Sequence, residues 1–126
     1  MKRIDIDNLN NLTTQLLDEL KILPQIYENN EEPSKDKTFF QYVRNETKVL
    51  FDMLDEWEKL AEDFVLQRSS GVHLHQIQAT KDNMQTLILH SYYKDVRKRR
   101  YMEIYKSCKF IFQQVLKELS NEGSTD

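Results

Sequence analysis

The clearest pattern in the chain lies in residues 39–65, where apolar positions recur at alternating steps of three and four. The positions are Phe40, Val43, Thr47, Leu50, Leu54, Trp57, Ala61 and Phe64. This spacing places them in one stripe along a single face of an α-helix. We therefore predict a long helix over residues 37–69, around which the other helices pack. Asp36 or Thr38 would cap its start, and Gly71, in a left-handed conformation, would stop it.

Similar stripes predict three more helices. They cover residues 7–28, 75–92 and 95–120, and the tail 121–126 is expected to fray. The chain has only two glycines and two prolines, too few for the many tight reversals of an all-β protein. A length of 126 residues suits a single domain. The sequence thus predicts an all-α fold, an antiparallel up-and-down four-helix bundle that spans residues 1–126 as one domain.

Individual residues indicate where these helices begin and end. Asp7 or Asn8 would cap the first helix, and Asp95 would cap the last. Pro24 falls inside the first helix, where its missing N–H and its ring force the helix to kink or to end. The apolar period continues afterwards at Tyr27, which favours a kink. Both outcomes remain open from the sequence.

Charge and composition exclude some partners and locations. The net charge of −3 argues against a protein that binds nucleic acid, because such binding is driven by neutralisation of phosphates. No run of about 18 apolar residues is present, so we expect no transmembrane helix and no membrane partner. The single cysteine, Cys108, rules out an internal disulfide, and no apolar run follows the basic N-terminus as in a signal peptide. We expect a cytoplasmic protein.

The predicted interior offers no obvious catalytic group. The stripes of residues 7–28, 37–69 and 95–120 contain no Asp or Glu, and no histidine follows a glutamate by three residues. A ferritin-like metal centre, which needs both features, is therefore excluded. Phosphate-binding loops, nucleophile elbows and Cys-x-x-Cys pairs are absent as well. We expect a packed interior with Trp57 and Cys108 as core residues, no cofactor and no enzymatic activity.

Two histidines form the weak candidate for a metal site. His73 and His75 would place both imidazoles on one side of an extended segment, as in some zinc sites. His90 lies ~22 Å further along the predicted helix and cannot share the ion. A third ligand would come from the same end of the bundle, from Asp5, Asp7 or Glu122. The favoured alternative is a polar loop at the helix entry in which one histidine caps a neighbour.

A basic run opens the last helix and is the sharpest local feature. It consists of Lys94, Arg97, Lys98, Arg99 and Arg100. Cations at a helix N-terminus oppose the helix dipole, so a nearby negative charge should offset them. Acidic residues at the same end of the bundle are available for this role, namely Glu28, Glu31 and Glu32. We favour this structural interpretation over an anion site that holds phosphate or an acidic partner.

The order of several residues resembles a known family. The succession is Phe39-Phe40-x-x-Val43, Trp57, His75-Gln76, Asn83, Ser91-Tyr92, Lys98-Arg99 and Ser107. It resembles the YppE-like family of small bacterial proteins. The resemblance implies a cytoplasmic, all-α four-helix bundle from a Gram-positive bacterium, and it implies no activity and no catalytic residues. The family leads us to expect a proline after the histidine at the start of the third helix, where this chain has Gln76.

Two functional hypotheses follow. The first is a non-enzymatic interaction protein that binds another protein, or itself, through its outer surface. Its candidate contacts are the basic start Arg97–Arg100 and the acidic face of residues 37–69, which a solvated surface would also explain. That face carries Asp52, Asp55, Glu56, Glu58, Glu62 and Asp63. The second is a metal- or anion-binding bundle centred on His73 and His75 or on Arg97–Arg100.

Overall fold

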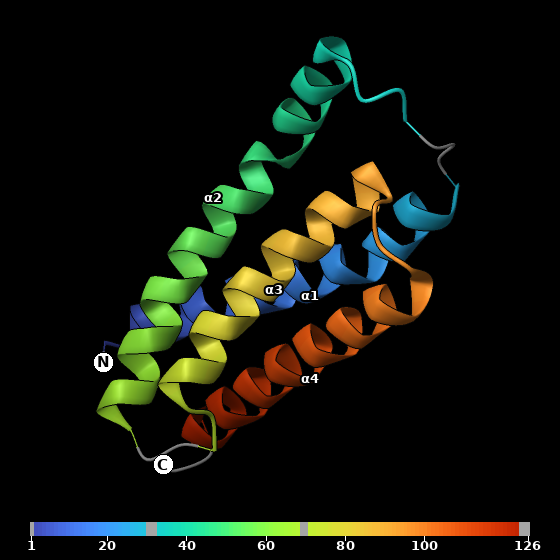
Figure 1. Ribbon diagram of the computed structural model, residues 1–126. Coiled ribbons are helices and arrows are strands. Elements are labelled where there is room, and N and C mark those ends of the chain that lie inside the picture. Colours follow the sequence, from blue (N-terminus) through green and yellow to red (C-terminus); the bar gives the residue numbers. More distant parts are fainter. Residues whose placement is uncertain (1, 30–32, 69–70, 124–126) are drawn as a thin grey trace.

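The computed structural model describes residues 2–29, 33–68 and 71–123 of the chain. These residues form helices α1 (Arg3–Asn29), α2 (Lys37–Gln67), α3 (Leu74–Tyr93) and α4 (Lys98–Gly123), and they contain no strand. The helices run alternately up and down (Figure 1). The predicted all-α, antiparallel four-helix bundle is confirmed.

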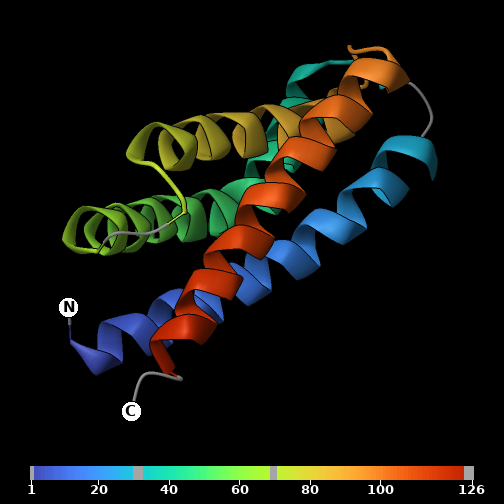
Figure 2. The same ribbon diagram turned by 90° about the horizontal axis from the view of Figure 1, so that it is seen from below.

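The two pairs of diagonally opposed helices differ in how closely they pack. Each helix packs against its neighbours in the ring, and α1 also contacts α3 across the bundle, whereas α2 and α4 barely meet. Seen from below, α2 and α3 run together on one side and α1 and α4 on the other (Figure 2). None of the helices in the described part of the chain is long and apolar enough to cross a membrane.

Trp57 anchors the core, as predicted. Its side chain is fully buried, and its ring packs edge-on against Phe112 with centroids 5.1 Å apart. The indole Nε1 donates a hydrogen bond of 2.9 Å to Thr13 Oγ1. The Thr13 hydroxyl in turn donates to the carbonyl of Leu9 at 2.7 Å. The hydrogen bond to Thr13 thus offsets the cost of removing the indole N–H from water.

Cys108 also lies in the core, as predicted. Its side chain is buried in α4, and burial raises the pKa of its thiol to about 12. A thiol with so high a pKa is not a thiolate near neutral pH, so it packs as a small apolar residue.

The first helix differs from its predicted limits. It begins at Arg3, so neither Asp7 nor Asn8 caps it, and Asp7 instead pairs with Arg3 at 3.4 Å one turn earlier. The helix continues through Pro24 to Asn29, so an end at Pro24 is wrong. Tyr27 explains the continuation, because its ring packs on the core and its hydroxyl donates to the carbonyl of Val96 at 2.7 Å.

The cap of α2 was predicted correctly, but its end was not. Asp36 precedes the helix, and its carboxylate accepts a hydrogen bond of 2.8 Å from the backbone N–H of Phe39. The helix ends at Gln67, and no glycine in the described residues has a positive φ, so Gly71 is not a left-handed stop. The N–H of Gly71 instead donates to Glu118 Oε1 at 3.1 Å, which ties the connection between α2 and α3 to α4.

The turn between α3 and α4 also corrects the prediction. Lys94 ends α3 in the left-handed conformation, with φ of 57°, and its N–H donates to the carbonyl of His90. Asp95 caps no helix, because α4 begins only at Lys98. The Asp95 carboxylate lies 2.6 Å from Nδ1 of His90 instead. At its other end α4 reaches Gly123, so residues 121–123 of the expected frayed tail are helical, and 124–126 lie outside the described residues.

One position of the central stripe leaves the core. The buried residues of α2 are Val43, Thr47, Leu54, Trp57, Ala61 and Phe64, and Leu50 is half-buried. Phe40, which the pattern placed in the same stripe, is 48% exposed. The N-terminal part of this 31-residue helix diverges from the bundle (Figure 1). The stripe therefore continues on α2 beyond the region that the other helices cover.

Candidate functional site

The two histidines proposed for a metal site lie at the start of α3. Their rings are parallel, with centroids 5.8 Å apart, and both side chains are exposed. His73 is the N-cap residue of α3, and Gln76, three residues later, completes a capping box, because its Oε1 accepts a hydrogen bond of 2.9 Å from the backbone N–H of His73. The described residues contain no group of three His, Cys, Asp or Glu side chains placed to hold a metal ion. The side chain of Glu122, one candidate ligand, lies outside them.

The basic start of α4 is offset in part by carboxylates, and of the predicted partners Glu28 is the one that the described residues show in this role. Lys98 Nζ lies 2.7 Å from Glu28 Oε1 at the end of α1, and this contact raises the pKa of Lys98. Arg99 and Arg100 pair within α4 with Glu103, at 3.7 and 3.5 Å. Arg97 precedes the helix, and its carbonyl accepts from the N–H of Tyr101. Glu31 and Glu32 lie outside the described residues.

Part of the acidic face of α2 binds α3. Lys81 of α3 reaches Asp55 at 3.0 Å and Glu58 at 3.1 Å, and these hydrogen bonds, the one to Asp55 first, raise the pKa of its ammonium. Glu56 and Asp63 are exposed. The face thus serves partly as a bridge between two helices and partly as a solvated surface.

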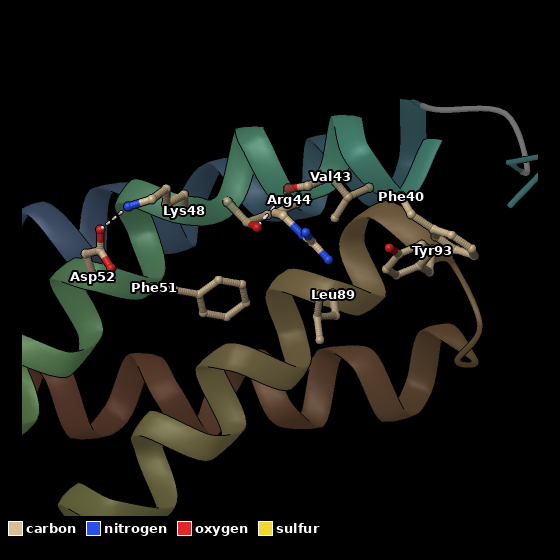
Figure 3. A pocket seen from close by; sticks show the side chains of 9 residues that line it. Phe40, Val43, Arg44, Lys48, Phe51, Asp52, Leu89 and Tyr93 are labelled. Carbon is tan, nitrogen blue, oxygen red and sulfur yellow. Dashed lines mark hydrogen bonds and ion pairs between the residues drawn. The ribbon is translucent and has the colours of Figure 1, made fainter. Parts of the chain in front are cut away.

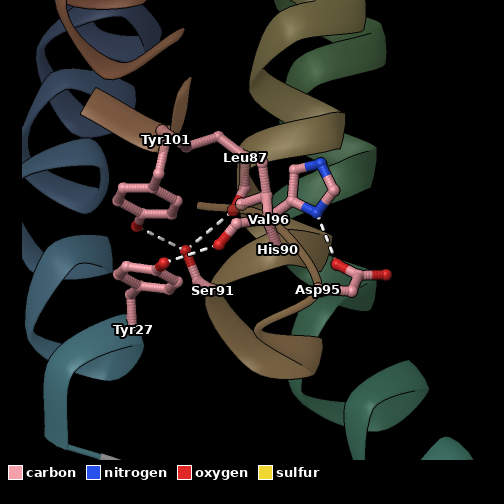
Figure 4. A network of polar contacts seen from close by, with 7 residues as sticks. All are labelled: Tyr27, Leu87, His90, Ser91, Asp95, Val96 and Tyr101. Carbon is pink, nitrogen blue, oxygen red and sulfur yellow. Dashed lines mark hydrogen bonds and ion pairs between the residues drawn. The ribbon is translucent and has the colours of Figure 1, made fainter. Parts of the chain in front are cut away.

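A serine, a histidine and an aspartate meet near the end of α3, but they do not form a catalytic triad. The Ser91 hydroxyl is fully buried and donates to the carbonyl of Leu87 at 2.7 Å. Tyr101 lies 2.6 Å away and supplies the other hydrogen bond of Ser91. His90 points away from Ser91 and toward Asp95 (Figure 4). No base is therefore within reach of the serine.

The feature that sequence reasoning did not find is a groove between α2 and α3. It encloses about 620 Å³ and opens to the surface beside the diverging part of α2 (Figure 3). The lining residues of α2 recur at alternating steps of three and one and therefore lie on one face of the helix, and α3 adds two residues one turn apart. They are Phe40, Val43, Arg44, Thr47, Lys48, Phe51 and Asp52 from α2, and Leu89 and Tyr93 from α3.

Aromatic side chains at the end of α3 account for the groove. Tyr93 contacts Phe39 with ring centroids 5.4 Å apart and Phe40 at 5.8 Å. Tyr92, on the adjacent position, meets the ring of Tyr42 at 6.2 Å. The distance between packed helices depends on the side chains at the contact, so these rings hold the first turns of α2 away from the bundle.

The groove has an apolar floor and a charged rim. Val43 and Thr47 are buried at its floor, and the Thr47 hydroxyl is satisfied by the carbonyl of Val43 at 2.8 Å. Phe40 and Leu89 expose 48% and 39% of their surfaces. On the rim Lys48 pairs with Asp52 at 3.3 Å, whereas Arg44 extends toward α3 (Figure 3). In the described part of the chain Arg44 makes no ion pair.

One signal in the sequence pointed to this site. The predicted helix 37–69 is much longer than the predicted helix 75–92, and in the structure α2 has 31 residues and α3 has 20. Two antiparallel neighbours of such unequal length cannot cover each other over their whole stripes. The extra turns of α2, which include Phe40, were therefore the place to expect exposed apolar surface.

Comparisons with known sequences point to one protein family. Residues 13–119 match the family described as "Bacterial domain of unknown function (DUF1798)". The "Uncharacterized protein YppE" of Bacillus subtilis (strain 168) is 25% identical over 114 residues, which cover 90% of this chain and 93% of that protein. The resemblance to YppE-like proteins is thus confirmed.

Solved structures show the same fold. The crystal structure of yppE from Bacillus subtilis has a TM-score of 0.79 and 24% identity, over 94% of this chain and 97% of that one. A Listeria innocua protein of unknown function has a TM-score of 0.83 and 20% identity, over 97% of this chain and 98% of that one. Since the match to the family extends over most of the sequence, the chain belongs to the bacterial family of unknown function DUF1798.

Proposed function

We propose that the protein is a non-enzymatic interaction module that binds another protein in the groove between α2 and α3. The observation that carries this proposal is the cluster of apolar side chains in the groove, with Phe40 and Leu89 exposed. Exposed apolar side chains that gather in one place, rimmed by charged residues, are typical of interaction sites. We expect the binding to take place in the cytoplasm.

The chemistry of the lining supports binding rather than catalysis. The groove residues include no histidine and no cysteine. The hydroxyl of Thr47 is engaged by its own helix, and the carboxylate of Asp52 is paired with Lys48. General acid–base or nucleophilic catalysis needs a titratable group or an activated nucleophile that reaches a substrate. The groove offers apolar contact area and cationic charge instead.

The proposal is tested by exchanging one exposed ring in the groove and one elsewhere. Phe40→Ser removes a ring from the groove, and Phe110→Ser removes a ring that is 58% exposed on α4. Tagged wild type and both variants are used to capture proteins from cells that express the chain naturally. We expect one captured protein to be lost with Phe40→Ser and kept with Phe110→Ser, and to bind the purified wild type in a titration. Equal capture by all three chains would refute the proposal.

A further inference from the structure

We infer that the occupant of the groove is an amphipathic helix of another protein that places acidic side chains against Arg44 and Lys48. The inference rests on the proposed function and names the chemistry of the partner. It follows from the shape of the groove, from the charges on its rim and from the poor fit of a second copy of the chain.

The shape of the groove fits a helix. Its wall on α2 runs from Phe40 to Asp52, which is ~18 Å along the helix axis at ~1.5 Å per residue. Leu89 and Tyr93 form the facing wall on α3. A partner helix of about three turns covers this length, and its apolar stripe meets the floor as in other helix-in-groove complexes.

The rim of the groove selects the charge of that helix. Arg44 has no carboxylate partner in the described part of the chain, and Lys48 shares only Asp52. Covering Arg44 with apolar surface would desolvate an uncompensated cation, whereas a partner carboxylate would compensate it. Arg44 and Lys48 are four residues apart and so lie one turn apart on the same face of α2. Acidic residues one turn apart on the partner helix would meet both.

A second copy of the chain does not match both the apolar residues and the charges of the groove. Consider two α2 helices packed antiparallel about a twofold axis between residues 45 and 46. Phe40 then faces Phe51 of the second copy, but Val43 faces Lys48 of the second copy, so the apolar residues match only in part. The same register faces Arg44 with Thr47 of the second copy and places Arg44 and Lys48 of both copies around the axis. Like charges placed together disfavour that dimer.

A different position of the twofold axis does not remove this mismatch between the two copies. With the twofold axis at Lys48, Arg44 faces Asp52 of the second copy, but the two Lys48 side chains meet on the axis. Phe40 then faces Glu56 of the second copy, so its ring is covered by an acidic side chain. Neither of these registers matches both the apolar residues and the charges, while a separate acidic helix can match both.

Two synthetic helical peptides test the inference against the full chain. Both carry the same leucine stripe over about four turns, and the positions that flank the stripe are Glu in one peptide and Lys in the other. Binding is measured by fluorescence anisotropy at low and high salt. We expect the Glu peptide to bind at least about tenfold more tightly than the Lys peptide, with the difference reduced by salt. Arg44→Glu plus Lys48→Glu should reverse the preference, and Arg99→Glu, on α4, should leave it unchanged.

Other outcomes would overturn the inference. These are equal affinity for the two peptides, no binding of the Glu peptide, or a preference that survives the Arg44→Glu plus Lys48→Glu change. Stronger binding to phosphatidylglycerol vesicles than to the Glu peptide would indicate a membrane occupant instead. A dimer in light scattering that Phe40→Ser dissociates would indicate a second copy. If a cellular partner still depends on Phe40 while the Glu peptide fails, the proposed function stands and the acidic partner does not.

Discussion

Phe40 and Leu54 occupy the same apolar stripe of α2 and should respond very differently to truncation. Leu54 is fully buried, whereas Phe40 is 48% exposed on the wall of the groove. We therefore predict that Leu54→Ala destabilises the protein strongly and that Phe40→Ala destabilises it little. The comparison tests whether the start of α2 is a binding surface or part of the core.

The expected cost of Phe40→Ala follows from the burial of the ring. Full burial of a phenylalanine side chain contributes about 1.5–3 kcal/mol, and roughly half of this ring is covered. Loss of the tilted contact with Tyr93 increases the destabilisation by about 0.5 kcal/mol, and the higher helix propensity of alanine decreases it by about 0.5 kcal/mol. The net loss should be about 1 kcal/mol. Leu54→Ala removes a fully buried side chain and should cost about 2–5 kcal/mol.

Urea unfolding followed by circular dichroism measures both losses, and the fluorescence of Trp57 provides a second probe of the same transition. The m-value should stay unchanged in both variants if the unfolding remains two-state. A loss for Phe40→Ala as large as that for Leu54→Ala would mean that the first turns of α2 pack as core. In that case the groove would not be a free surface, and the proposed function would lose its support.

Three further predictions concern the core and the turn before α4. Trp57→Ala should lower the free energy of unfolding by about 3–5 kcal/mol in urea titrations, and a nearly unchanged stability would contradict its role as core anchor. Cys108, with its pKa raised to about 12, should react with a thiol reagent in the folded protein far more slowly than in urea, and equal rates would show that it is accessible. Burial is the largest single influence on the pKa of Asp95 and would raise it, but the hydrogen bond from His90, a backbone hydrogen bond and the nearby positive charges together outweigh burial, so the pKa is lowered. The stabilisation by Asp95 should therefore be present above its unfolded pKa of about 3.9 and be lost as the pH falls through the lower folded pKa. The free energies of unfolding of wild type and Asp95→Asn should differ at about pH 6 and converge at about pH 2.

The fold could be predicted because each helix repeats its apolar period over many turns. In the stripe of α2, positions such as Leu54 and Phe64 occur at a spacing that no strand would produce, and the few glycines limit the number of reversals. Helix ends were less predictable. Gly71 is held by Glu118 of α4, a tertiary contact that has no local signature, and Asp95 is held by His90, five residues earlier in the chain. A cap predicted from neighbouring residues fails where another side chain competes for the same group.

Apolar periodicity alone did not predict the groove, because it identifies an apolar face but not what covers it. Phe40 and Leu54 follow the same period, yet only Leu54 is enclosed by other helices. Arg44 and Lys48 read as ordinary surface cations until the structure places them beside exposed apolar side chains. The sequence instead drew attention to Arg97–Arg100, where the cations are dense but largely paired with Glu28 and Glu103.

The polar network at the end of α3 and the groove depend on each other. Ser91 is fixed to Tyr101 of α4, and the tyrosine ring stacks on Tyr27 of α1 with centroids 4.1 Å apart. These contacts hold the last turn of α3 against α1 and α4 (Figure 4). The next two residues along that turn are Tyr92 and Tyr93. The rings of Tyr92 and Tyr93 are the ones that hold α2 away from the bundle. Ser91 therefore helps to anchor the α3 wall of the groove through Tyr101, while His90 turns to Asp95, so the three side chains form no reactive arrangement.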